Sequence, residues 1–274
     1  MGVVKIVVII LVVVLVAIAI LSIYSMMNHR NLLKQEAKAF PPLGDMVTVD
    51  GTMMHVFAEG EGDLTLVFMA GHGTSGPLLD FKPLWKRMTD FYRIAVVERP
   101  GYGWSETSER PRDIDTILEE SRKALELAGE KPPYVLLPHS MAGLEAIRWA
   151  QRYPEEIKAI VGLDMCTPET IALLAQPNGI QLTLMRLTMD LGLARYMDDS
   201  QMRVNLPLLE STDLSDEDKA AYLALFHKST LTRDMKRELE FLSQNADTVA
   251  ADGIPTDKPM FFFISEGQHE LVAG

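Results

Sequence analysis

The hydrophobic pattern begins with an apolar run that contains no charged residue between Lys5 and Arg30. A helix of this run is long enough to cross about 30 Å of hydrocarbon. We expect residues 1–29 to be an uncleaved membrane anchor. A signal peptide is the alternative, but the small residues 17–19 fit a cleavage site poorly because they lie inside the run. A buried core helix is disfavoured because the run is apolar on every face.

The charges on either side of the run do not settle how this anchor is oriented. Lys5 and the terminal amine lie on one side, and three basic residues diluted by Glu36 lie on the other: Arg30, Lys34 and Lys38. The count leans toward a cytoplasmic C-terminal domain. The difference is small, so we expect a single-pass membrane protein with the side of its catalytic domain open.

Strand patterns follow a linker that is predicted over residues 30–45. The stretch MVTVDGTMMHVFAEGEG alternates, turns at Asp50 and Gly51 and alternates again, which predicts a β-hairpin. Short continuous apolar runs are typical of parallel strands buried on both faces. Such runs occur at 64–70, 93–98, 134–138, 157–164 and 258–267, with helical spacing at 111–129 and 141–153. This alternation predicts an α/β fold with a doubly wound, mostly parallel sheet.

The stretch 166–257 interrupts the alternation with three helical patterns, at 180–197, 215–228 and 232–244. A structureless loop of this length is implausible, so we expect a helical cap inserted between two strands. Its Met and Leu residues either line an apolar substrate pocket or pack the cap against the core. The expected order is anchor 1–29, linker 30–45, core 46–165, cap 166–257, and a last core strand within 258–274.

Composition narrows the classes of partner. The formal net charge of the 274 residues is −12 and there is no cluster of Lys and Arg, so a nucleic-acid partner is not expected. Cys166 is the single cysteine, which excludes an internal disulfide framework. The sequence has no Cys/His cluster with metal-ligand spacing, so we expect neither a metal nor an organic cofactor.

The strongest chemical signal is Ser140, which lies in PHSMAG between a predicted strand and a predicted helix. A nucleophile on such a tight turn needs small neighbours, and the common pattern is G-x-S-x-G. Pro138 replaces the first glycine, Ala142 replaces the second, and Gly143 follows. The helix N-terminus would stabilise negative charge at the serine. Because a serine before a helix is also a common N-cap, PHSMAG alone leaves both roles open.

Two further stretches favour the catalytic role. FMAGHGTSGPLLDFKPLW follows the first core strand, and backbone N–H groups of its glycine-rich part are suited to bind an oxyanion. The second donor in such a site is the N–H of the residue after the nucleophile. VVERPGYGWSE follows the second core strand and reads as a rigid turn.

These motifs, in this order, resemble those of the α/β-hydrolase superfamily, and within it the proline iminopeptidase and esterase-like branch with an inserted cap. The resemblance covers nearly all of residues 46–270. His72 and Gly73 look like the family's oxyanion loop, which implies the N–H groups of Thr74 and Met141 as donors. ERPGYGWS is similar to the family's D-x-P-G-x-G-x-S, with Glu98 in place of Asp. Serine at the elbow argues against a dehalogenase or epoxide-hydrolase mechanism, which needs a carboxylate nucleophile.

The resemblance implies a triad in the order serine, acid, histidine. SEGQHE places Glu270 at the acid position. Asp164, at the end of an earlier strand, is the alternative acid, and it also fits a structural role there. Family members carry the histidine after a final strand, and no histidine of this chain is so placed: His29, His55, His72, His139, His227 and His269. We therefore expect this sequence to be a truncated form that lacks the base.

Two functions follow from these observations. The first is a membrane-anchored serine hydrolase that cleaves a small-molecule ester or amide, as a carboxylesterase or aminopeptidase does, through an acyl-enzyme at Ser140. The second is a catalytically inactive membrane protein that uses the hydrolase fold for binding. In both cases the expected partners are a small molecule and the membrane.

Overall fold

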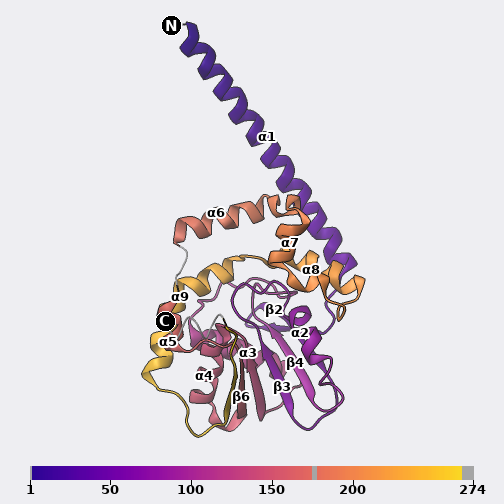
Figure 1. Cartoon of the computed structure of the whole chain (residues 1–274), viewed down its shortest axis with the longest axis vertical. Helices are drawn as coiled ribbons and strands as arrows, with labels where there is room; N and C mark the ends of the chain where they lie inside the picture. The colour runs from indigo at the N-terminus through magenta and orange to yellow at the C-terminus, as the bar shows by residue number, and fades with distance from the viewer. Residues whose placement is uncertain (1, 175–177, 267–274) are drawn as a thin grey trace.

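A seven-stranded mixed sheet organises the chain (Figure 1). The computed structural model describes residues 2–174 and 178–266. The strands, in spatial order, are β1 (Asp45–Val49), β2 (Thr52–Glu59), β4 (Arg93–Glu98), β3 (Thr65–Met69), β5 (Tyr134–Pro138), β6 (Ile157–Leu163) and β7 (Met260–Phe263). β2 pairs antiparallel with β1 and β4, and every other pair is parallel. The predicted α/β fold with a mostly parallel sheet is confirmed.

The β1–β2 hairpin forms at the predicted turn. Asp50 and Gly51 have φ angles of 47° and 86°, as a tight two-residue hairpin turn requires. The central strands β3 and β5 are buried along their whole length. Their sequences are continuously apolar because helices cover both faces of the sheet.

Three helices connect the first strands: α2 (Pro77–Trp85), α3 (Ile114–Leu127) and α4 (Ala142–Arg152). A short 3-10 turn, η1 (Pro154–Glu156), precedes β6. The Asp113 side chain caps α3 by accepting a hydrogen bond from the Thr116 N–H at 3.0 Å. The sequence did not predict α2, which begins with a proline in its first turn and buries Leu78, Leu79 and Phe81.

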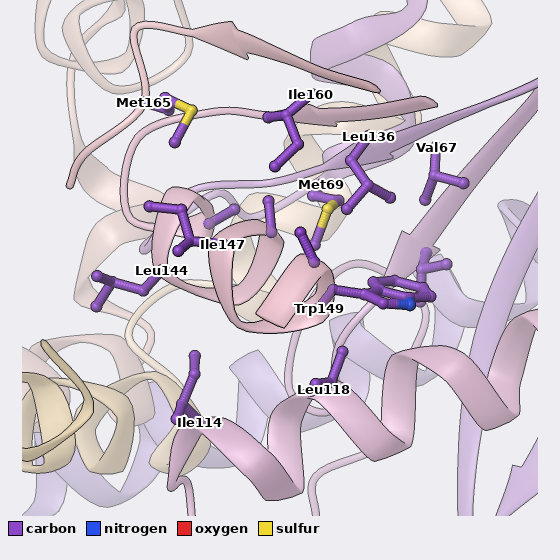
Figure 2. Packing of buried hydrophobic residues seen from close by; sticks show 14 of the residues in the cluster. Val67, Met69, Ile114, Leu118, Leu136, Leu144, Ile147, Trp149, Ile160 and Met165 are labelled. Atoms are coloured by element: carbon purple, nitrogen blue, oxygen red, sulfur yellow. The ribbon is translucent and has the colours of Figure 1, made fainter. Parts of the chain in front are cut away.

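Two apolar clusters lie on opposite faces of the sheet. On one face α3 and α4 pack Leu118, Ile147 and Trp149 against Val67 and Leu136 of the strands (Figure 2). The second cluster contains side chains from α2, the strands and a later helix: Leu79, Phe81, Phe68, Val96 and Phe226. Burial of these apolar surfaces is the main term that holds the layers together.

A helical insertion lies between β6 and β7. It consists of α5 (Pro168–Leu173), α6 (Gly179–Asp190), η2 (Leu193–Tyr196), α7 (Asp199–Asn205), η3 (Pro207–Glu210), α8 (Asp216–Ser229) and α9 (Arg233–Ala251). We expected the cap to cover all of residues 166–257. The last helix of this stretch, α9, instead packs against the core. Leu242, Ala246 and Val249 join the first cluster, and the Asn245 side chain accepts a hydrogen bond from the Ile114 N–H at 2.8 Å.

The apolar N-terminal run forms the first part of α1 (Gly2–Ala39), which projects from the globular part (Figure 1). Among the described residues, it is the single helix long and apolar enough to be a candidate membrane span. The predicted linker 30–45 is mostly helical, because α1 continues to Ala39. Residues 30–39 are rich in helix-forming Leu, Lys, Gln, Glu and Ala, and this end of the helix rests on the insertion.

Candidate active site

Ser140 lies on a sharp turn between β5 and α4. Its φ angle is 50°, in the left-handed region that serine rarely adopts. The turn is held by hydrogen bonds from the Gly143 and Cys166 N–H groups to the Ser140 carbonyl, at 3.0 Å and 2.8 Å. Strain of this kind persists only where the surroundings fix it, and it often marks a functional site.

The neighbours of Ser140 must be small, as the sequence predicted. A Cβ atom on Gly143 would lie 2.0 Å from the Cys166 carbonyl oxygen, and one on Gly71 would lie 2.7 Å from the Ser140 Cβ. The N-cap of α4 is Met141, so the alternative that Ser140 caps this helix is not supported. The Cys166 thiol lies beside the serine. Burial raises the pKa of this thiol, and hydrogen bonds to Thr170 and Ser140 partly oppose the shift.

The two predicted oxyanion donors have no hydrogen-bond acceptor among the described residues. Thr74 follows Gly73, whose φ is 82°, and Met141 follows the nucleophile candidate. Within the described part of the chain, neither backbone N–H donates to a protein acceptor. Met141 is adjacent to Ser140 in the sequence, and Thr74 lines a cavity together with His139. Open N–H groups at both positions would suit stabilisation of a developing oxyanion.

A cavity of about 680 Å³ lies between the loops after β3 and β5 and the helical insertion. Thr74, His139 and Leu163 come to it from the core, and Leu208 and Phe226 from the insertion. Its wall is mixed, with aliphatic and aromatic side chains beside a few polar groups, as in many small-molecule sites.

Of the two candidate acids, Asp164 lies within the described residues and Glu270 does not. Asp164 directly follows β6 with a φ of 53°. Its carboxylate accepts hydrogen bonds from the Ser265 N–H and hydroxyl, at 2.9 Å and 2.7 Å, and so ties β6 to the segment after β7. Glu270 and the neighbouring His269 lie outside the described residues.

The five described histidines lie in three different places. His55 is fully buried against Glu98, with 3.0 Å between its Nδ1 and the Glu98 Oε2. His29 and His227 both contact Arg195, where α1 meets the insertion. His72 and His139 line the cavity. None of these five described side chains hydrogen-bonds to the Ser140 hydroxyl.

The turn after β4 is organised by Glu98, which stands where the similar family motif has Asp. Its carboxylate accepts hydrogen bonds from the Trp104 N–H at 2.7 Å and the Leu78 N–H at 3.2 Å. A Cβ atom on Gly103 would lie 2.0 Å from the same carboxylate. Glu98 therefore fixes the start of α2, and with it one wall of the cavity.

Sequence reasoning missed a pair of polar residues in the cavity wall. Asp80, in α2, accepts a hydrogen bond from the Tyr222 hydroxyl of α8. Burial raises the pKa of Asp80 to about 7, although this hydrogen bond opposes the shift. No local signal marks the pair, because its members are 142 positions apart and α2 was not predicted.

A second missed feature is a buried ionic cluster beside the oxyanion loop. Arg99 donates to Glu145 at 3.2 Å and lies 3.4 Å from Glu238 of α9. The Tyr102 hydroxyl donates to Glu238 at 2.5 Å. Among the described residues, no group of three or more His, Cys, Asp or Glu side chains is placed to hold a metal ion.

The amino-acid sequence is similar to proteins with an α/β-hydrolase fold. A family model described as the α/β hydrolase fold matches residues 76–197. The uncharacterized protein YbdG of Bacillus subtilis strain 168 is 37% identical over 243 residues, which cover 88% of this chain and 74% of that protein. A pimeloyl-[acyl-carrier protein] methyl ester esterase of Xanthomonas oryzae pv. oryzae is 32% identical over 133 residues, which cover 48% of this chain and 47% of the esterase.

Solved structures share the fold at low identity. The epoxide hydrolase VrEH1 of Vigna radiata superposes with a TM-score of 0.60 at 20% identity, over 84% of this chain and 83% of that one. The chain belongs to the α/β-hydrolase family. Its sheet order, the strand–serine–helix turn and the sequence matches all support this.

Proposed function

We propose that this chain is a membrane-anchored serine hydrolase that cleaves an ester by acyl transfer at Ser140. The observation that carries the proposal is the left-handed turn at Ser140 with the open N–H groups of Thr74 and Met141 assigned to the same site. The Ser140 Oγ attacks the carbonyl carbon while its proton passes to a histidine base. The two N–H groups hold the oxyanion, the alcohol leaves with the proton, and water hydrolyses the acyl-enzyme.

The proposal assigns the triad acid to Glu270. Asp164 is the alternative, but both of its carboxylate oxygens accept hydrogen bonds from Ser265, which supports a positioning role for Asp164. In place of the expectation that the base is absent, the proposal assigns it to His269, which precedes Glu270 in the sequence and lies outside the described residues. A serine hydroxyl without such a base is a weak nucleophile.

An ester is proposed ahead of an amide for two reasons. The Xanthomonas relative is named as a methyl ester esterase. The cavity wall also presents Phe81, Leu208 and Phe226, which suit an acyl chain. One observation favours an aminopeptidase-like activity instead, because the Asp80 carboxyl lines the same cavity and, when ionised, would pair with a substrate ammonium group.

Hydrolysis of two substrate series tests the proposal. The full chain in detergent is assayed with p-nitrophenyl esters of increasing acyl length and with aminoacyl p-nitroanilides. We expect turnover of esters, lowered on the order of 10³-fold or more in Ser140→Ala. The matched control is Ser200→Ala, which removes an exposed hydroxyl of α7. Equal activity in both variants would contradict the proposal, and binding of the ester without turnover would leave the alternative binding role.

A further inference from the structure

Helix α1 is held against the globular part by several hydrogen bonds. Beyond the exposed apolar part, α1 packs on the insertion from Ser25 onward. The Ser25 hydroxyl donates to the Leu191 carbonyl at 2.7 Å, and Arg195 donates to both carboxylate oxygens of Glu36 at 2.7 Å. Near the end of α1, the Trp104 indole donates to the Phe40 carbonyl at 2.9 Å. Contacts spread over about 22 Å of helix hold α1 in one direction relative to the globular part.

This fixed direction determines where a bilayer lies. Residues 6–24 contain no charged residue and their large apolar side chains are exposed, and as a helix they span about 28 Å, close to the thickness of the hydrocarbon core. The body contacts begin at Ser25, directly after this part. The globular part therefore meets the membrane with the surface that surrounds Ser25.

Helix α6 lies at that level. Its C-terminal end touches α1, because Leu191 accepts the Ser25 hydrogen bond and a Cβ atom on Gly192 would lie 2.5 Å from the His29 Cβ. From this contact α6 extends sideways, across the direction of α1, at the point where α1 leaves the globular part (Figure 1). A helix in this position runs along the plane of the membrane surface.

The outward face of α6 is apolar. Ile180, Leu184 and Leu187 are 75%, 58% and 51% exposed. At about 100° per residue these three side chains fall within one arc of about 60°, opposite the buried Leu182 and Met189. The helix is thus apolar on the face that packs on the body and again on the exposed face.

Charge does not oppose contact of this face with lipid. Arg186 and Asp190 are the charged residues of α6, and they pair with each other at 2.7 Å. Arg186 also donates to the Leu231 carbonyl at 2.8 Å, so its guanidinium is engaged with the body. The exposed apolar surface continues past the helix at Leu193 and Tyr196. Aliphatic side chains with an aromatic neighbour are typical of helices that lie in a membrane interface.

We propose that the outward face of α6 lies in the surface of the same bilayer that α1 crosses. The globular part is then held flat against the membrane by two elements, one spanning and one interfacial. This inference rests on the proposed membrane location of α1 and on no catalytic step. The segment that follows, through η3, lines the cavity with Pro207 and Leu208, so the lipid-facing surface and the candidate substrate site are built from neighbouring parts of the chain.

Quenching by brominated lipid tests the proposal. The full chain carries Cys166→Ala and one new cysteine labelled with an environment-sensitive dye, and is reconstituted into phosphatidylcholine vesicles with or without dibrominated phosphatidylcholine. Leu184→Cys reports on the outward face of α6. Val12→Cys reports on the membrane location of α1, and Lys131→Cys reports on an exposed loop before β5 as the water-facing control.

We expect blue-shifted emission and loss of intensity to brominated lipid at positions 12 and 184, and neither effect at 131. Quenching at 12 together with water-like emission at 184 would overturn this inference while leaving the anchor intact. No quenching at 12 would overturn the membrane location itself. Blue-shifted emission at 184 without quenching would also overturn the inference, because it would show that a protein surface, such as a second copy of the chain, covers this face of α6 in place of lipid. None of these readouts depends on catalysis.

Discussion

The Glu238 Oε2 of α9 lies 3.7 Å from the Nδ1 of His72. This contact joins the end of the helical insertion to the loop that carries Thr74. The same oxygen accepts the Tyr102 hydroxyl, and the carboxylate faces the Arg99 guanidinium. The position of the proposed oxyanion donor is therefore coupled to a buried ionic cluster, which makes Glu238 a positioning residue.

Replacing Glu238 by Gln is expected to destabilise the protein in a pH-dependent way. Burial raises the pKa of Glu238, but Arg99, His72 and Tyr102 outweigh burial and lower it to about 2 from the ordinary 4.5. A carboxyl whose pKa is lowered on folding stabilises the fold above its unfolded pKa, and this contribution is lost as the pH falls through the folded pKa. At neutral pH the loss should be on the order of 3 kcal/mol, because a buried ion pair is broken.

Urea unfolding of wild type and Glu238→Gln at several pH values measures this effect. The difference in the free energy of unfolding should shrink as the pH falls from about 4.5 toward 2. Glu240→Gln, an exposed position on the same helix, is the control and should change stability little at any pH. A Glu238→Gln difference that stays constant with pH would contradict the account.

At Asp80 the ionised carboxylate is expected to lower the stability of the fold as the pH rises, which is the opposite of the effect at Glu238. Burial raises the pKa of Asp80 to about 7, so the folded protein keeps this proton where the unfolded chain has lost it. Wild type should therefore lose stability between about pH 4 and 7, and Asp80→Asn should lose less. Urea unfolding at pH 5 and pH 8 compares the two, with the exposed Asp90→Asn as control. Equal pH slopes for wild type and Asp80→Asn would show that Asp80 is ionised in the folded protein.

Gly143→Ala should damage the turn at Ser140. The added Cβ would lie 2.0 Å from the Cys166 carbonyl oxygen, so α4 or the loop after β6 must move. Overpacking of this kind costs about 1–3 kcal/mol. Gly179→Ala is the matched control, since a Cβ there meets nothing within 4 Å. Thermal unfolding should show a lower transition temperature for Gly143→Ala and little change for Gly179→Ala, whereas equal temperatures would argue against a crowded elbow.

The sequence predicts the fold well where the hydrophobic pattern is local. The hairpin at Asp50 and Gly51 and the continuous apolar strands appear as predicted, because turn geometry and two-sided burial leave direct marks in the sequence. Helix α2 was missed since PLLDFKPLW contains two prolines and follows a glycine-rich loop. The sequence pattern predicts a linker over 30–45, but residues 30–39 continue α1, and this part of the helix is stabilised by packing on the insertion.

The candidate site is predictable only in its motif residues. Ser140, Thr74 and Met141 could be proposed from the sequence because their roles depend on neighbours in the sequence, and these roles stay predictions. Glu238 and Asp80 were not found, since their partners come from distant elements that meet only in the folded chain. The placement of α9 in the core has the same cause, because its apolar spacing shows that a face is buried without showing against what.

The measurement that tests the central claim most directly is reaction of the full chain with a fluorophosphonate, followed by mass spectrometry of the modified peptide. The account predicts a single adduct on Ser140, formed by wild type and by Ser200→Ala, and absent from Ser140→Ala. The phosphoryl adduct depends on the same nucleophile and the same two N–H donors as acyl transfer does. A wild-type chain that stays unmodified at Ser140, or an adduct on another residue, would contradict the assignment of Ser140 as the nucleophile.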